Sequence, residues 1–152
     1  NNSTYAVFEL YVAGDPGTQV ALDGGAPQTI DATGFLSLTI PTYELSSGVN
    51  SGRATRVVSD GPVQVFGNNY QSATVDAFTV LPDGLLGTEY YAIAYPNAIS
   101  MSSYPSQIAI TAAEDNTTVV VGAEAAVVLN TGETLYLGRD GDPHRGGQAC
   151  GR

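Results

Sequence analysis

The sequence predicts an all-β protein, an antiparallel β-sandwich of about 9–11 short strands. Apolar and polar residues alternate with a period of two over most of the chain, as in strands with one buried face. Clusters of Gly, Pro, Asp and Asn interrupt this alternation at short, regular intervals. No longer stretch keeps a helical period with capping residues at its ends. These three observations together favour short strands joined by tight turns.

The strand boundaries follow from where the alternation starts and stops. Turn-forming residues separate the strands, for example at Gly14–Gly17, Asp60–Pro62 and Asn130–Gly132. Leu81–Leu86 has room for a single helical turn, because Pro and Gly within it disfavour a longer helix. The predicted strands are Tyr5–Val12, Thr18–Leu22, Phe35–Ile40, Ala54–Ser59, Val63–Asn68, Asp76–Val80, Tyr90–Ala94, Gln107–Ala112, Thr117–Val121, Ala126–Leu129 and Thr134–Leu137.

The composition is typical of one extracellular domain spanning residues 1–152. Hydrophobic residues make up 43% of the chain, enough to build a core at this length. Only 13% are charged, which leaves a surface rich in Ser, Thr, Asn, Gln and Gly. Cys150 is the one cysteine, so no internal disulfide is expected. No apolar run is long enough to span a membrane, and the start at Asn1 fits a processed secreted protein or a fragment.

The charge balance argues against two classes of partner. The net charge is −10, from 15 acidic and 5 basic residues, and every basic residue is Arg. Nucleic-acid binding needs basic groups that displace counterions from phosphates, so we expect none here. An anionic membrane surface would repel the domain for the same reason. The acidity is explained by solubility, and the functional alternatives are calcium or a basic partner.

The chain echoes itself, which is compatible with two related halves. A strand of the form Thr-x-Val is followed by a turn and by a second strand, Gly34–Leu38 in the first half and Gly132–Leu137 in the second. In the first half this leads to the Ser-Asp-Gly-Pro-Val-Gln-Val strand. After Leu137 the composition changes abruptly, since Gly138–Arg152 holds three of the five arginines, the His and the Cys. We expect residues 139–152 to be disordered, or to be a truncated end that belongs to a cut-off continuation.

Three uncommon sequence motifs follow one another between Arg56 and Val121. They are Val57–Gly67 (VVSDGPVQVFG), then Asp76–Pro82 (DAFTVLP) with Leu86–Tyr91 (LGTEYY), and then Ile108–Val119 (IAITAAEDNTTV). Their order and spacing resemble the N-terminal domain of the IgGFc-binding protein family, known from mucus-associated and bacterial surface proteins. The resemblance implies an extracellular β-domain that makes contacts, and its shared residues are fold residues. It identifies no residue that would contact an immunoglobulin.

Two small sites are candidates for modification or metal binding. The sequons place glycosylation candidates at Asn2 and Asn116, if the chain is eukaryotic and secreted. Glu114–Asn116 and Asp140–Asp142 are oxygen-rich loops of the type that calcium prefers. Neither has EF-hand spacing, and carboxylates in turns commonly hydrogen-bond the backbone. We therefore expect no metal site and no cofactor.

The sequence does not support catalysis. The single His, His144, lies in the Gly-rich tail six positions from Cys150, where neither residue is held in a productive geometry. The chain has no Trp for sugar stacking, and strand or rim packing explains its tyrosines. We expect a non-enzymatic protein without catalytic residues.

The first strand, Tyr5–Val12, is a candidate donor for a neighbouring sheet. Its two faces consist of Tyr5, Val7, Glu9 and Tyr11 on one side and of Ala6, Phe8, Leu10 and Val12 on the other. The second face is fully apolar and must be buried. It either closes the sandwich of its own chain or adds to the sheet of another copy, where main-chain hydrogen bonds supply affinity.

The candidate acceptor edge lies in the region Thr117–Leu137. An apolar strand edge without charges invites pairing with another chain, and head-to-tail pairing of this kind produces a filament. The residues assigned to this acceptor edge are Val119, Val120, Val121, Val127, Val128 and Leu129.

We therefore expect a secreted or cell-surface structural subunit that self-assembles into a fibre or surface layer by strand addition, as a homo-oligomer or filament. A first alternative, implied by the resemblance, is an adhesion module that binds an immunoglobulin or another glycoprotein. A second alternative is a carbohydrate-binding module.

Overall fold

The structure is a computed structural model that describes residues 7–41, 45–71, 74–93 and 107–137. In these residues it is nearly all β, with antiparallel strands throughout, which confirms the predicted fold class. The chain divides into two compact units. Unit 1 comprises residues 1–44 and 55–86, and unit 2 comprises residues 45–54 and 87–152.

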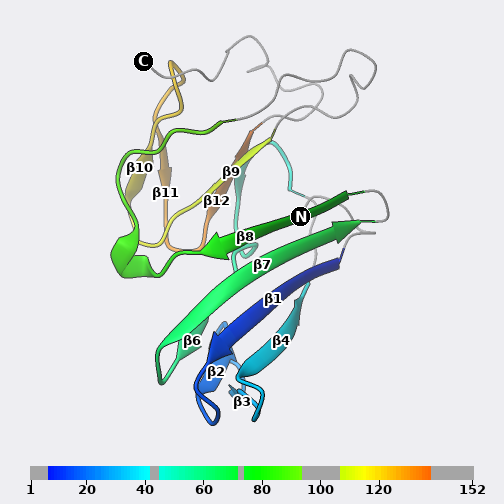
Figure 1. The fold of residues 1–152 in the computed structure, drawn as a ribbon. Helices are drawn as coiled ribbons and strands as arrows, with labels where there is room; N and C mark the ends of the chain where they lie inside the picture. The colour runs from blue at the N-terminus through cyan, green and yellow to red at the C-terminus, as the bar shows by residue number, and fades with distance from the viewer. Residues whose placement is uncertain (1–6, 42–44, 72–73, 94–106, 138–152) are drawn as a thin grey trace. The chain divides into compact units, whose positions relative to one another are not determined.

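Unit 1 contains two antiparallel sheets (Figure 1). The first has the order β4 (Phe35–Ile40), β1 (Val7–Gly14), β7 (Val63–Gln71) and β8 (Thr74–Val80). The second has the order β3 (Gln28–Thr29), β2 (Gln19–Leu22) and β6 (Val57–Ser59). A 3₁₀ turn, η1 (Asp83–Leu85), follows β8 and confirms the single helical turn predicted there.

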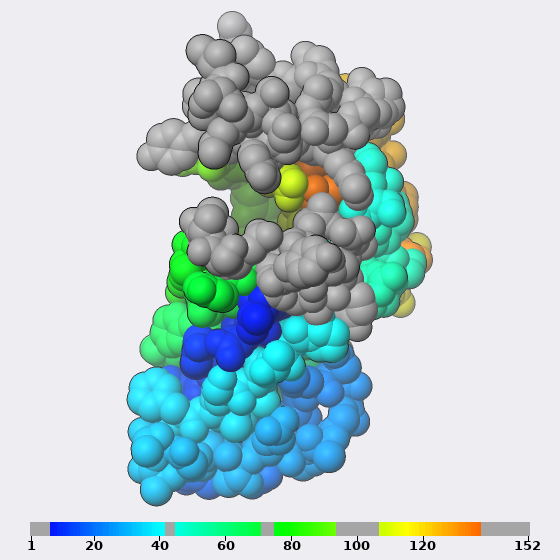
Figure 2. Space-filling model, turned by 90° about the vertical axis from the view of Figure 1, so that its right-hand side faces the viewer, coloured from blue at the N-terminus to red at the C-terminus, as the bar shows by residue number. Residues whose placement is uncertain are grey.

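The core of unit 1 lies between its two sheets. Leu10 and Val12 of β1 are buried while Tyr11 between them is exposed, so the alternation predicted for this strand is confirmed. Figure 2 shows β1 in dark blue between the cyan of β4 and the green of β7. The buried cluster consists of Leu10, Val12, Val20, Ile30, Leu38, Ile40 and Val65, with Phe8, Leu22, Leu36, Val57, Val63 and Val80 packed against it.

Gly67 in β7 allows an aromatic ring to cross the sheet. It pairs with Leu10 on one side and with Phe78 on the other. A Cβ atom at Gly67 would lie closer to the ring of Phe78 than real Cβ contacts allow. The Phe78 ring in turn stacks on Phe8, with the ring centroids 6.1 Å apart. The glycine therefore makes room for this aromatic pair.

Unit 2 also contains two antiparallel sheets. The first has the order β5 (Gly48–Asn50), β12 (Thr134–Leu137) and β9 (Ile108–Thr111). The second pairs β10 (Thr117–Val119) with β11 (Val127–Leu129). Its buried cluster is smaller than that of unit 1. It consists of Ala112, Leu129 and Leu135, with Val119, Val121, Val127 and Leu137 packed against it.

Two short strands were missed from the sequence and one predicted strand is wrong. β3 and β5 have two and three residues, too few to show an alternation. The predicted strand Tyr90–Ala94 is not a strand over residues 90–93, and residue 94 lies outside the described residues. Tyr90 and Tyr91 are exposed and bond locally, to the N–H of Gly87 and to Glu89. Local polar contacts thus replace sheet pairing in this segment.

The two units repeat one four-strand arrangement. In unit 1 the first strand pairs with the fourth and the second with the third, and unit 2 does the same with β9 to β12. A residue of β1 corresponds to the residue 98 positions later, and a residue of β2 to β4 corresponds to the one 99 positions later. The corresponding pairs include Val12–Leu36 with Ile110–Leu135, Leu10–Leu38 with Ile108–Leu137, and Val20–Gln28 with Val119–Val127.

Hydrogen bonds at the end of the first strand follow the same correspondence. The N–H of Gly14 donates to the carbonyl of Gly34 at 3.1 Å, and the N–H of Ala112 donates to the carbonyl of Glu133 at 3.0 Å. The echo in the sequence therefore corresponds to a repeated structural arrangement. The turn after the first strand is one residue longer in unit 2, which explains the change of offset.

Candidate association edges

The units differ in what covers the first and second strands of the repeat. In unit 1, β7 pairs with β1, and β6 pairs with β2. Among the described residues of unit 2, β9 pairs only with β12 and β10 only with β11. The sides of β9 and β10 that correspond to the covered sides in unit 1 are called here the unit-2 edge.

The backbone of β9 directs two amide groups to this edge. The N–H of Ala112 points to β12, because it donates to the carbonyl of Glu133. Successive N–H groups along a strand point to opposite sides. The N–H groups of Thr111 and Ala109 therefore face away from β12. In unit 1 the corresponding residues, Ala13 and Tyr11, face β7.

The corresponding argument for β10 uses the covered strand β2. The N–H of Asp23 donates to the carbonyl of Arg56 at 2.9 Å, and the N–H of Gln19 donates to Oδ1 of Asp60 at 2.8 Å. These bonds tie β2 to β6 and to the turn after it. Gln19 corresponds to Thr118 in the repeat, so the N–H of Thr118 belongs to the unit-2 edge.

The side chains of the unit-2 edge are uncharged. Neither Ile108–Thr111 nor Thr117–Val121 contains an acidic or basic residue. Natural edge strands are commonly protected by charges, Pro or bulges. Val120 is 59% exposed beside β10. Among the described residues, no charge on these two strands opposes pairing with a further strand.

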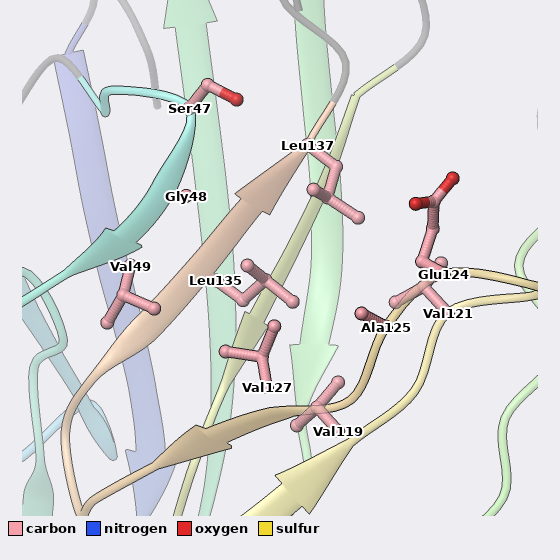
Figure 3. Close-up of a pocket in the computed structure, with 10 residues that line it drawn as sticks. All are labelled: Ser47, Gly48, Val49, Val119, Val121, Glu124, Ala125, Val127, Leu135 and Leu137. Atoms are coloured by element: carbon pink, nitrogen blue, oxygen red, sulfur yellow. The ribbon is translucent and has the colours of Figure 1, made fainter. Parts of the chain in front are cut away.

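An apolar pocket of about 340 Å³ lies within unit 2. It is lined by residues of both sheets, from β5, β10, β11 and β12, and by residues of the loop between β10 and β11. Figure 3 shows Val127 of β11 and Leu135 of β12 pointing toward each other, with Val119 and Leu137 on either side. Glu124 also lines the pocket, with its carboxylate directed away from the other labelled side chains (Figure 3). The space between the sheets of unit 2 is therefore incompletely filled.

The turns beside the edge are stabilised by carboxylates. Oδ1 of Asp115 accepts the N–H of Thr131 at 2.9 Å, and this bond lowers the pKa of Asp115 below its ordinary value. Glu133 accepts the N–H of Asn130 at 2.8 Å and the hydroxyl of Ser51 at 2.9 Å, and these bonds lower its pKa. These two carboxylates therefore stabilise turns in unit 2.

The candidate calcium and glycan sites lie partly in this region. In the described part of the chain, no three His, Cys, Asp or Glu side chains gather as they would around a metal ion. Asn116 is exposed in the turn after β9 and adopts a positive φ of 59°, so an acceptor side chain there is accessible. Asn2, His144, Cys150 and Asp140–Asp142 lie outside the described residues.

The predicted donor strand is part of a four-stranded sheet in its own chain. Val7 to Val12 belong to β1, which pairs with β4 on one side and with β7 on the other. Tyr5 and Ala6 lie outside the described residues. This arrangement is the first of the two considered from the sequence, closure of the sandwich by its own strand.

The residues predicted as the acceptor edge lie in or directly beside the two-stranded sheet of unit 2. Val119 belongs to β10, Val127 to Leu129 belong to β11, and Val120 and Val121 follow β10. Their role as an acceptor stays a prediction. The sequence did not identify β9 as part of the same edge. The sequence repeat that relates the two halves could have identified it. Extending that repeat by one strand toward the N-terminus makes β9 the counterpart of β1.

The described residues thus form an all-β module of two related units with open strand edges. The model of the IgGFc binding protein family matches residues 76–145. This match confirms the resemblance and includes β9 to β12. Neither the curated proteins nor the solved structures gave a match. No helix within the described residues has the length and hydropathy required to cross a bilayer.

Proposed function

We propose that this chain is a non-enzymatic extracellular module that associates with other polypeptides by strand addition at the unit-2 edge. The observation that carries the proposal is the difference between the two units. The strands that cover the first and second repeat strands in unit 1 have no counterpart among the described residues of unit 2. Exposed backbone donors and acceptors on uncharged strands favour pairing with another chain.

The composition supports an extracellular location and an associative role. The surface is rich in uncharged polar residues, and the net charge of −10 keeps the free chain soluble. The matched family is typical of extracellular proteins. The non-enzymatic character is part of the proposal and is supported by the sequence, in which the single His and the single Cys both lie in the Gly-rich tail.

The narrower form of the proposal is a fibre or surface layer made of copies of this chain. In that form, Tyr5–Val12 of one copy adds to the unit-2 edge of the next. Because β1 pairs on both sides within its own sheet, donation requires unit 1 to open. Removing residues 1–12 would also unfold unit 1, so that deletion does not separate assembly from folding.

A single substitution at the edge gives a cleaner test. Ala109→Pro removes an edge N–H and adds a ring that blocks a neighbouring strand, whereas Ala109→Thr keeps the N–H and the strand propensity. We expect the Thr variant to associate like the parent in sedimentation and negative-stain images, and the Pro variant to remain monomeric. Equal association of both variants would reject the unit-2 edge as the site.

A second candidate function follows from the family match. The matched segment, residues 76–145, includes the strands of the unit-2 edge. On this basis the ligand is an immunoglobulin Fc or another glycoprotein. The test is retention of the chain on immobilised Fc, with the Ala109 variants run in parallel. Retention that is lost only in Ala109→Pro would make Fc the strand-adding partner, and no retention would reject this candidate.

A further inference from the structure

We propose that the exposed face of the four-stranded sheet in unit 1 binds an extended, uncharged, β-linked glycan chain. The strands β4, β1, β7 and β8 lie side by side in this sheet (Figure 1). One face of the sheet packs on the core of unit 1. The opposite face, which carries Tyr11, Phe66 and Tyr70, is called here the aromatic face. It shares no residue with the unit-2 edge.

The alternation along β1 and β7 places three rings on the aromatic face. Tyr11 and Phe66 each lie between two buried residues of their strands, so both side chains point away from the core. Tyr70 follows Phe66 by four positions and therefore lies on the same face. The exposed fractions of Tyr11, Phe66 and Tyr70 are 37%, 38% and 50%, and none of them belongs to the buried cluster. Core packing therefore does not explain these aromatic residues.

The register of the sheet arranges the rings as an elongated platform. Tyr11 lies directly opposite Phe66, and side chains in such pairs have Cβ atoms about 4.5–5.5 Å apart. Tyr70 lies roughly 13 Å further along β7, since a strand rises by about 3.3 Å per residue. An exposed ring offers a flat apolar surface that the C–H face of a sugar ring can cover. A platform of this shape suits an extended, flat chain, as β-1,4-linked sugars form.

A row of polar side chains crosses the sheet between the aromatic pair and Tyr70. Glu9 lies opposite Thr39 on one side and opposite Asn68 on the other. The hydroxyl of Tyr11 donates to Oε2 of Glu9 at 2.6 Å. This bond raises the pKa of Tyr11, and the side chain of Asn68 acts on it in the opposite direction. The polar groups beside the Tyr11 ring are therefore already organised in the free chain.

The charge and hydrogen-bonding groups of the aromatic face favour an uncharged glycan. Of the described residues that the strand alternation places on this face, only Glu9 is charged. Its carboxylate accepts hydrogen bonds and repels anions, and the net charge of −10 adds to this repulsion. A protein surface that buried this carboxylate would have to supply donors to it. The hydroxyl groups of a sugar chain supply such donors along its whole length.

The test titrates the full chain with two uncharged probes and follows the backbone amide signals by NMR. The probes are hexasaccharides of β-1,4-linked glucose and of β-1,4-linked N-acetylglucosamine, and heparin is the anionic comparison. At least one hexasaccharide is expected to bind saturably and to shift the amide signals of Tyr11, Phe66 and Tyr70 most strongly. Heparin is expected not to shift them. Because the ligand is uncharged, its affinity should not depend on the salt concentration.

Substitutions at Phe66 test the role of the ring. Phe66→Thr removes the ring but keeps a high strand propensity, and it should weaken binding by about tenfold or more. Phe66→Tyr keeps the ring and should bind like the parent. Val58→Thr is the matched control, because Val58 is exposed on β6 in the other sheet of unit 1. This control should leave the affinity unchanged.

Four results would overturn the inference. They are no binding of either hexasaccharide, signal shifts confined to other residues, equal binding by Phe66→Thr and the parent, and binding of heparin alone. Ala109→Pro should leave glycan binding unchanged, because Ala109 is not part of the aromatic face. Failure of glycan binding would therefore leave the proposed strand addition intact, and failure of strand addition would leave the glycan site intact.

Discussion

Units 1 and 2 are built on the same four strands but are completed differently. Unit 1 adds β6 and β7 to its second and first strands, and it buries seven apolar side chains in one cluster. Unit 2 instead adds β5 to its fourth strand, and its cluster has three buried members. Among the described residues, the sides of β9 and β10 that correspond to the covered sides of β1 and β2 therefore have no paired strand, and the related half shows which kind of strand covers them there.

The outer side of the fourth strand shows the opposite difference between the two units. In unit 1 the outer side of β4 has no partner among the described residues, whereas the corresponding strand of unit 2, β12, is covered there by β5. β5 has only three residues and starts at Gly48, whose φ is 95°. The cover on β12 is thus short, while that on β1 and β2 spans both sheets. The two units are related in sequence order but not equivalent in exposure.

The largest expected contrast comes from placing proline at corresponding positions of β1 and β9. Tyr11→Pro removes an N–H that faces β7 in the middle of a four-stranded sheet, so it should destabilise unit 1 by more than about 3 kcal/mol. Ala109→Pro affects an edge and should destabilise unit 2 by at most about 1 kcal/mol. Urea unfolding followed by residue-resolved NMR measures both. Similar losses in the two units would contradict the difference in cover.

Cavity-forming substitutions sharpen the same comparison. Leu10 is 4% exposed, and Leu10→Ala should lower the free energy of unfolding of unit 1 by about 2–5 kcal/mol. Ile108 is the corresponding residue of β9, but it is only partly buried. Ile108→Ala should therefore cost about half as much in unit 2. The same urea unfolding experiment measures both losses in free energy. Equal losses would mean that β9 is as well covered as β1.

A smaller effect tests the packing that is specific to unit 1. Gly67→Ala places a Cβ atom against the Phe78 ring, and it should destabilise unit 1 by about 1–3 kcal/mol. Gly84→Ala is the matched control, because its Cβ would meet no atom within 4 Å. In a double-mutant cycle, Phe78→Ala should remove most of the cost of Gly67→Ala. Purely additive effects would rule out the steric cause.

The smallest effect is on the pH dependence of unit 2. Hydrogen bonds hold the pKa of Asp115 below 3.8 and that of Glu133 below 4.5 in the folded chain. The unfolded chain therefore binds more protons near these values, and the stabilisation present above about pH 4.5 is lost as the pH falls. Asp115→Asn should therefore reduce the loss in the free energy of unfolding of unit 2 as the pH falls. Asp31→Asn should act only on unit 1, because Thr33 lowers the pKa of Asp31 there.

Acid unfolding monitored separately in the two units checks this prediction. If Asp115→Asn leaves the acid transition of unit 2 unchanged, the hydrogen bond to Thr131 does not contribute to its stability. If Asp31→Asn shifts both units equally, the two units do not unfold independently.

Much of the fold was predictable because strand periodicity is a local property. The alternation in Tyr5–Val12 predicted both the strand and its buried face, and Pro82 with Gly84 predicted a single helical turn. β3 and β5 were not predictable, because two or three residues carry no periodic signal. Tyr90 and Tyr91 misled the prediction, since β-forming residues take up sheet structure only where a partner strand is available.

The candidate site was only partly predictable. Val119 to Leu129 stand out as apolar and uncharged, and the structure places them in or beside β10 and β11. The contribution of β9 depends on pairing between segments far apart in the sequence, as does the placement of β1 between β4 and β7. Such long-range register is not readable from one strand alone.

The most direct test of the central claim is hydrogen exchange of four backbone amides in the isolated chain. Tyr11 and Ala13 face β7, and their counterparts Ala109 and Thr111 face the unit-2 edge. We predict strong protection for Tyr11 and Ala13 and rapid exchange for Ala109 and Thr111. Strong protection of Ala109 and Thr111 without any added partner would contradict the account, because it would show that β9 is already covered.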